Sequence, residues 1–207
     1  MEEVLFGDPF QNHESNYLTP VDLYNLCQTC KQYKKTITKQ YFEKATIKEI
    51  RRRLLYLYKT KTNLYNFLTN LKKGVISGSF IIECILDNYC DEIDCYYPNT
   101  VHFNKEVSRF KMNDYFSKYY LDQIVLSSFD TTMRHMILKT NNVHLFIDSE
   151  FDFDICKNRY WYTNKDQLYV KSFNQILSKK AVSPYNIKTP NHRELKYINK
   201  GFTFIKK

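Results

Sequence analysis

The sequence predicts an α+β protein in which an all-helical segment, residues 1–73, precedes a mixed α+β domain, residues 74–207, with a small mixed sheet flanked by helices. Helix start signals and helical spacing of apolar residues dominate as far as Gly74. Beyond Gly74, short alternating runs bounded by turn residues indicate strands. Aromatic residues make up 16% of the 207 residues, which is enough to build a core and excludes a disordered chain.

Three helices are predicted in the first segment. Thr19 followed by Pro20 is typical of a helix start, because the threonine side chain can cap the first turn and proline suits its first position. Thr46 and Glu49 form a capping-box pattern, which predicts that a second helix begins near Thr46. The third helix is predicted over 63–73, where the glycine that follows ends it.

The second segment alternates between strands and helices. A strand end is predicted before Gly78, because Gly-Ser after a short β-branched run favours a tight turn. The predicted elements are, in order, the strand and turn at 75–79, a helix at 80–89, a strand at 93–97, a helix within 104–119, strands at 123–128, 132–139, 151–155 and 168–170, a helix from 189 to about 197, and a strand at 202–205.

The charge of the chain narrows the class of partner. There are 31 basic and 22 acidic residues, which gives a net charge of +9 and favours polyanions such as nucleic acid, nucleotides or an anionic membrane. No apolar run approaches the ~20 residues that a membrane-spanning helix needs, and the acidic start shows no export signal. The run 51–53, three arginines, is interpreted as a solvated helix face, with contact to nucleic acid as the alternative.

Two short motifs could together bind a magnesium-bound nucleotide. Gly78 and Ser79 would place small residues and free amides at the start of a helix, where a phosphate group binds readily. Glu92 and Asp94 are two residues apart on a predicted strand, so both side chains point to the same face. Paired carboxylates repel unless a cation lies between them, and Mg²⁺ prefers such oxygen ligands.

A third carboxylate is predicted to come from the run 151–155. If this run is a strand, its aromatic and aliphatic side chains face the core while Asp152 and Asp154 face outward together. Three convergent carboxylates could hold metal ions that bridge phosphates. The alternative is that Glu92 and Asp94 are solvent-side residues of an ordinary edge strand.

The order of these motifs resembles that of a known superfamily. Gly-Ser, a short helix and a strand with the pattern carboxylate–hydrophobic–carboxylate resemble the polymerase-β-like nucleotidyltransferases. The chain also resembles proteins of large DNA viruses of protists (giant viruses) that join a degenerate F-box-like helical segment to a minimal nucleotidyltransferase-like domain. The stretches that carry this second resemblance are 18–31, 78–97, 151–157 and 196–204.

The resemblance implies a role for each site residue. Gly78 and Ser79 match the phosphate-binding turn, Glu92 and Asp94 match the first two metal carboxylates, and Asp152 best matches the third. The last three residues would then bind Mg²⁺ and act in catalysis, with a nucleoside triphosphate as substrate. The family pattern usually has aspartate where this chain has Glu92, whose side chain is one methylene longer.

Two classes of function follow from the resemblance. The first is an enzyme that transfers a nucleotidyl group to a hydroxyl of an unknown acceptor, with a nucleotide or RNA as partner. The alternative is a catalytically inactive interaction or adaptor protein, in which the helical segment 1–73 binds a host ubiquitin-ligase component or a virion protein. Either class implies a location in the host cytoplasm or the virion, without membrane attachment.

Overall fold

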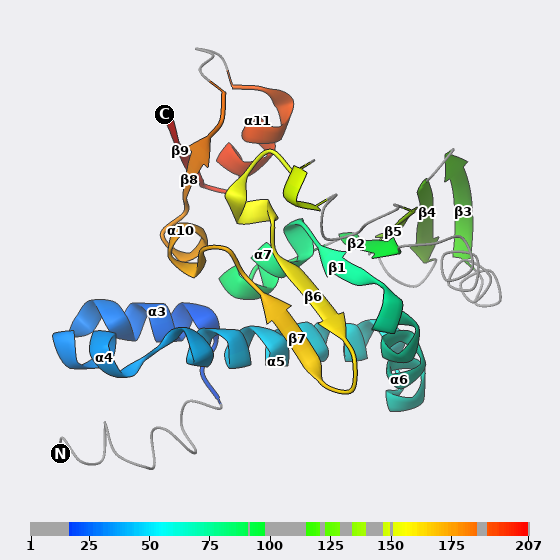
Figure 1. Ribbon diagram of the computed structural model, residues 1–207, viewed down its shortest axis with the longest axis horizontal. Coiled ribbons are helices and arrows are strands. Elements are labelled where there is room, and N and C mark those ends of the chain that lie inside the picture. The colour runs from blue at the N-terminus through cyan, green and yellow to red at the C-terminus, as the bar shows by residue number, and fades with distance from the viewer. Residues whose placement is uncertain are drawn as a thin grey trace.

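The structure is a computed structural model that describes residues 17–90, 92–97, 115–120, 123–128, 134–139, 147–149, 151–185 and 190–206. It confirms the α+β class: helices come first along the chain, and a mixed sheet with flanking helices follows (Figure 1). In the described part of the chain, no helix has the length and apolar character needed to cross a membrane.

The described elements before Gly74 are all helical. The predicted start at Thr19 is confirmed: its Oγ1 accepts a hydrogen bond from the backbone N–H of Asp22 at 3.2 Å, and the Asp22 carboxylate accepts one from the N–H of Thr19 at 2.9 Å. This reciprocal pair satisfies two otherwise unpaired donors of the first turn. The helices are α3 (Pro20–Thr29), α4 (Lys31–Thr36), α5 (Lys39–Tyr58), α6 (Lys61–Asn70) and the 3₁₀ turn η2 (Leu71–Lys73).

The predicted helix start at Thr46 is wrong, because α5 already begins at Lys39 and runs through it. Thr46 is buried, and its hydroxyl donates to the carbonyl of Phe42 at 2.7 Å, one turn back. A threonine can make this bond inside a helix as easily as it can cap one. Glu49 does not reach back to a cap; its carboxylate accepts hydrogen bonds from the guanidinium groups of Arg52 and Arg53.

The described strands form a seven-stranded mixed sheet in the order β3-β4-β5-β2-β1-β6-β7. Strand β2 pairs in parallel with β5, whereas the other neighbours are antiparallel. A second, two-stranded sheet pairs β8 and β9 in parallel. The strands are β1 (Val75–Ser77), β2 (Glu92–Tyr97), β3 (Tyr115–Tyr120), β4 (Gln123–Ser128), β5 (Arg134–Lys139), β6 (Arg159–Tyr162), β7 (Asp166–Tyr169), β8 (Lys180–Ser183) and β9 (Thr203–Lys206).

One prediction in the second segment is wrong, and another lies mostly outside the described residues. Residues 115–120, the described end of the helix predicted within 104–119, form strand β3; the rest of that prediction lies outside the described residues. Residues 151–155 are not a strand: a bend leads into the 3₁₀ turn η3 (Asp154–Cys156). At 151–155, aromatic and aliphatic residues alternate with aspartates, which is typical of a strand, so the local pattern could not predict the turn.

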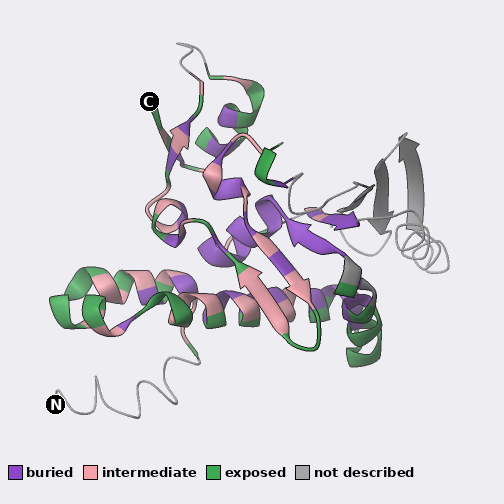
Figure 2. Cartoon of the chain, viewed as in Figure 1, coloured by how far each residue is buried: buried purple, intermediate pink, exposed green. Residues whose placement is uncertain are grey.

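Helix α7 (Ser79–Leu86) connects β1 to β2 and is buried along its whole length. Figure 1 shows α5 running beneath α7 and the β6–β7 hairpin, and α5 contacts both of these elements. The main core accordingly combines Leu54 of α5 and Phe67 of α6 with Phe80 of α7, Ile93 of β2 and Tyr160 of β6. Figure 2 shows this buried centre, with exposed residues gathered on the outer sides of the N-terminal helices.

Two further helices complete the described fold. They are α10 (Phe173–Leu177) and α11 (His192–Ile198), and α11 is capped by Asn191 with a reciprocal bond to Glu194. The chain after α11 is tied to the core by Lys200, which forms an ion pair with the buried Glu83 of α7. This contact holds the C-terminal part of the chain against α7.

Candidate functional site

All five predicted site residues line one cavity of about 260 Å³: Gly78, Ser79, Glu92, Asp94 and Asp152. They come from the start of α7, from β2 and from the bend before η3. Helix α11 contributes the remaining polar wall. The cavity therefore brings together segments that are more than a hundred residues apart in sequence.

The turn between β1 and α7 requires a glycine. Gly78 has a φ of +80°, a region that side chains other than glycine rarely adopt. A Cβ at this position would lie 2.9 Å from Asp94 Oδ2. The backbone before it is held by Ser77, which pairs with Asp94 across the strands and donates its hydroxyl to the carbonyl of Asn158 at 2.5 Å. The start of α7 thus lies directly against the Asp94 carboxylate.

Strand β2 presents its side chains as the alternation predicts. Glu92, Asp94 and Tyr96 line the cavity, whereas Ile93 and Cys95 lie in the core. The prediction that the two carboxylates share a face is therefore confirmed, and the reading of them as solvent-side residues does not fit, because Glu92 has only 17% of its side chain exposed. They face the cavity.

Asp94 has an unusual electrostatic environment for a carboxylate. Its Oδ1 is buried, and no hydrogen-bond donor among the described residues reaches it. Burial and, to a smaller extent, the negative charge of Glu92 raise the pKa of Asp94 to about 7, although Lys196 acts in the opposite direction. A buried carboxylate oxygen without a partner is costly, and a cation or donor in the cavity would satisfy it.

Asp152 reaches the cavity, although the strand predicted to carry it does not exist. Its Oδ1 accepts a hydrogen bond from the Tyr185 hydroxyl at 2.5 Å, and its Oδ2 forms an ion pair with Arg193 at 2.7 Å. Asp154 does not accompany it, since it lies outside the cavity lining and pairs with Lys171 at 2.8 Å. The 3₁₀ turn separates the two side chains that strand alternation would have placed together.

Sequence reasoning missed two basic residues of the site, Arg193 and Lys196 of α11. Arg193 neutralises Asp152, and Lys196 lies 3.8 Å from Glu92. They are three residues apart, so they share one face of the helix with the cavity-lining Tyr197. A helix was predicted here, so its basic face could have been recognised from the sequence. No local pattern, however, indicates that this face packs against β2.

The other half of the cavity is aromatic. Tyr96 and Phe151 meet edge to face, with ring centroids 5.9 Å apart, and Phe153 and Tyr197 meet in the same way at 6.0 Å. The thiol of Cys156 donates to the Tyr197 hydroxyl at 3.1 Å, and burial raises the pKa of this thiol to about 12. The cysteine is therefore a neutral wall residue, and the rings offer apolar surface for a flat ligand group.

The acidic residues of the cavity fit a metal ion only in part. In the described part of the chain, no three histidine, cysteine or acidic side chains stand close enough together to hold one. Glu92 and the partnerless Oδ1 of Asp94 suit Mg²⁺ as oxygen ligands on one strand face. Both oxygens of Asp152 are instead engaged by Tyr185 and Arg193. The donor set fits magnesium at two of the three predicted positions.

No protein-family model and no curated protein matches the chain. Among solved structures, it is similar to a CCA-adding enzyme in its apo form I, at 16% identity and a TM-score of 0.52, over 74% of this chain and 42% of that one. It is similar to a CCA-adding enzyme in complex with ATP at 14% identity and a TM-score of 0.53, over 74% and 41% of the two chains.

A Thermotoga maritima CCA-adding enzyme complexed with tRNA gives 14% identity and a TM-score of 0.52, over 74% of this chain and 42% of that one. The chain thus spans less than half of the length of these enzymes. At such low identity the likeness concerns architecture alone. Together with the β1–α7–β2 unit, it shows that the chain has a nucleotidyltransferase-like fold.

Proposed function

We propose that the cavity binds a nucleoside triphosphate with Mg²⁺ and transfers its nucleotidyl group to the hydroxyl of an acceptor. The start of α7 at Gly78 and Ser79 would hold phosphate oxygens through backbone amides. Glu92 and Asp94 would hold the metal. The observation that carries the proposal is the buried, partnerless Oδ1 of Asp94, which lies in the same cavity as this helix start.

The reaction is a substitution at the α-phosphorus. The acceptor oxygen forms a bond to this phosphorus, the bond to the bridging oxygen of the β-phosphate breaks, and pyrophosphate leaves. Asp152 would position the attacking hydroxyl and accept its proton, while Arg193 and Tyr185 orient that carboxylate. Magnesium, when bound, supplies neutralisation of the phosphate charge. The aromatic wall would receive the base.

The similar solved structures support the proposal in a limited way. CCA-adding enzymes are described in complexes with ATP, with CTP and with tRNA. A nucleotide as substrate and RNA as a partner or acceptor are therefore natural candidates for this chain. Because the chain covers only about two fifths of those enzymes, their whole activity stays a proposal here.

Calorimetry on matched variants tests the site. ATP and CTP are titrated with Mg²⁺ into the wild type, Asp94→Asn, Asp152→Asn and the control Asp154→Asn, whose carboxylate lies outside the cavity. We expect Mg²⁺-dependent binding by the wild type and the control, and binding weaker by roughly tenfold in Asp94→Asn, because a charge-assisted contact is lost. Equal heats for all four proteins would rule out the proposed site.

A catalytically inactive interaction protein is the second candidate. It is favoured by the ion pairs of Glu92 with Lys196 and of Asp152 with Arg193, which compensate the charge of two of the three carboxylates. Under this candidate the helical segment 1–73 serves as an F-box-like docking part for a host protein, as in the giant-virus proteins that the sequence resembles. The cavity would then be a remnant of a nucleotide site.

Labelled nucleoside triphosphates distinguish the two candidates. The protein is incubated with Mg²⁺ or Mn²⁺ and with RNA or protein acceptors, and transfer of label is measured. An enzyme adapted to Glu92 should lose activity in Glu92→Asp, since a shift of about an ångström can lower a rate ~10²-fold. An inactive protein should transfer no label in either form, and strong Asp94-dependent labelling would exclude it.

A further inference from the structure

The positive charge of the chain is concentrated in one segment. Nine of the 31 basic residues but only two of the 22 acidic residues lie in 31–53, which leaves a net charge of +2 for the rest of the chain. This segment is α4 together with most of α5. The segment 31–53 thus has a net charge of +7, whereas 74–207, with 18 basic and 15 acidic residues, has +3. The basic character that suggested a polyanionic partner is therefore strongest in the N-terminal helices.

Helix α5 presents part of this charge as a regular row. Lys44, Lys48 and Arg52 recur at intervals of four residues and are all exposed. Such residues lie on one face of a helix, about 6 Å apart along its axis. We call these three residues the basic stripe. The opposite face of α5 carries Ile50 and Leu54, both fully buried in the main core.

Exposed aromatic rings accompany the basic stripe. Tyr17 is 82% exposed, and the Nζ of Lys48 lies 5.6 Å from the centroid of its ring. Tyr56, one turn after Arg52, is 79% exposed, and both residues line a surface hollow of about 290 Å³. A tyrosine ring that is exposed beside a cation offers a flat face on which an unpaired base can stack.

We propose that the basic stripe, with Tyr17 and Tyr56, binds single-stranded nucleic acid. Cations in a row would follow the phosphates, and the tyrosine rings would stack on unpaired bases. Arg52 remains available for this although its guanidinium bonds to Glu49, because 64% of its side chain is exposed and the carboxylate lies beneath it, 10% exposed. Glu49 thereby orients the arginine toward solvent.

An anionic membrane is the weaker match for the same charge. A helix that binds a membrane surface inserts its apolar face into the lipid. The apolar face of α5 is occupied by the core, so only its polar face is available. Stacking on unpaired bases uses the exposed tyrosine rings directly.

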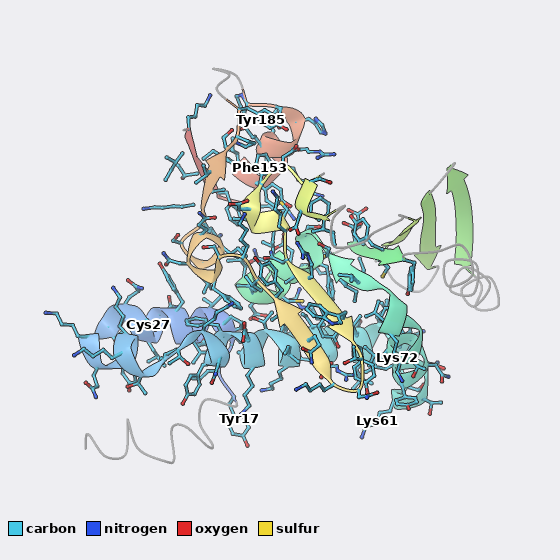
Figure 3. All side chains as sticks on the ribbon, in the orientation of Figure 1. Tyr17, Cys27, Lys61, Lys72, Phe153 and Tyr185 are labelled. Carbon is cyan, nitrogen blue, oxygen red and sulfur yellow. The ribbon has the colours of Figure 1, made fainter. Side chains whose placement is uncertain are left out.

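The stripe is a separate site from the cavity. Figure 3 shows Tyr17 beneath α5, well away from Phe153 and Tyr185 beside the cavity. Binding of nucleic acid here does not require a bound nucleotide or any catalytic activity. This proposal can therefore be tested independently of the proposed function. A bound strand would nevertheless supply a polymeric acceptor for the nucleotidyl transfer proposed for the cavity.

Fluorescence anisotropy with labelled oligonucleotides tests the proposal. The full chain, in EDTA to exclude metal effects, is titrated into a 15-nucleotide oligo(U) and a 15-nucleotide oligo(dT) at 50 and 200 mM salt. We expect the triple variant Lys44→Gln/Lys48→Gln/Arg52→Gln to weaken binding roughly tenfold or more at the lower salt, and to reduce the salt slope by about two, as loss of three phosphate contacts would do. Tyr17→Ala/Tyr56→Ala should weaken it roughly fivefold or more.

The control variant removes the same charge elsewhere. Lys61→Gln/Lys72→Gln/Lys165→Gln changes three exposed lysines, of which Lys61 and Lys72 lie near α6 in Figure 3. This control should bind like the wild type. Equal losses in both triple variants, no oligonucleotide binding at 50 mM salt, or binding only to vesicles with 30% anionic lipid would each overturn the proposal. Unchanged affinity in the tyrosine variant would also overturn it.

Discussion

At the scale of single residues, the candidate site depends on the contact between Gly78 and Asp94. The positive φ of Gly78 and the 2.9 Å from its absent Cβ to Asp94 Oδ2 leave no room for a larger residue. The contact places a carboxylate with a raised pKa beside the first amides of α7. Such an arrangement reduces the stability of the empty protein in favour of a bound ligand.

The pKa of Asp94 predicts how stability changes with pH. Because it rises from 3.8 in the unfolded chain to about 7 in the fold, the folded protein binds the extra proton between these values. The free energy of unfolding of the wild type should then fall as pH rises from 4 to 7, by roughly 2–4 kcal/mol relative to Asp94→Asn. Denaturant unfolding of both proteins in EDTA at pH 4, 6 and 8 measures this difference.

Asp154→Asn is the matched control for this prediction. Lys171 and Lys157 lower the pKa of Asp154, so its contribution to stability is present above pH 4 and is lost as pH falls through the lowered value. The free energy of unfolding of the wild type, relative to Asp154→Asn, should therefore rise with pH. The change should be smaller than the one predicted for Asp94, because these ion pairs are partly exposed. A wild type whose stability follows Asp94→Asn at all three pH values would contradict the assignment for Asp94.

At the scale of elements, α11 sets the charge balance of the cavity. Arg193 and Lys196 place two cations opposite the carboxylates of β2 and the bend before η3. The capping box at Asn191 and Glu194 fixes where this helix begins and therefore where Arg193 points. A metal ion held by Glu92 and Asp94 must compete with Lys196 for Glu92, and the positive charge of Arg193 repels it.

Removing one of these cations should therefore strengthen binding of a metal ion alone. Arg193→Gln is expected to raise the affinity for Mn²⁺ roughly three- to tenfold, because a like charge within a few ångströms of the site is lost. Electron paramagnetic resonance of free Mn²⁺ measures the change. Lys180→Gln, an exposed lysine of β8 outside the cavity, is the control and should leave the affinity unchanged. Equal affinities in both variants would show that Arg193 does not compete with a metal.

At the scale of the whole molecule, the N-terminal helices and the sheet share one core. Leu54 of α5 and Phe67 of α6 belong to the same buried cluster as α7, β2 and β6. The segment before the predicted boundary at residue 73 thus contributes to the packing behind the cavity. The division into domains 1–73 and 74–207 stays a prediction. The cooperativity of unfolding shows whether the two parts unfold separately.

A core substitution in α5 should destabilise the entire fold. Leu54→Ala removes a fully buried side chain and is expected to lower the free energy of unfolding by about 2–5 kcal/mol. Far-ultraviolet circular dichroism follows the helices, and fluorescence of Trp161 on β6 follows the sheet. The two signals should change together. The neighbouring Leu55 is 36% exposed, so Leu55→Ala should cost less than about 0.5 kcal/mol. Separate transitions would instead indicate two independently folding domains.

The sequence by itself determined the local features of this protein. The helical start at Thr19, the turn at Gly78, the shared face of Glu92 and Asp94 and the α+β class follow from residue types and spacing within a few positions. Helix capping, positive φ and strand alternation depend only on residues a few positions apart, so they can be predicted from the sequence without knowledge of the fold. The same local rules failed at Thr46 and at 151–155, where two structures satisfy one pattern.

Only the tertiary structure decided what surrounds these motifs. It placed Asp152 in the cavity from a bend and not from a strand, and it brought Arg193, Lys196 and Tyr185 to the carboxylates. It also set the pKa of Asp94, because burial and neighbouring charges depend on segments far apart in the chain. The spacing of residues in a strand does not indicate which distant helix will cover that strand. The packing of the shared core determines this.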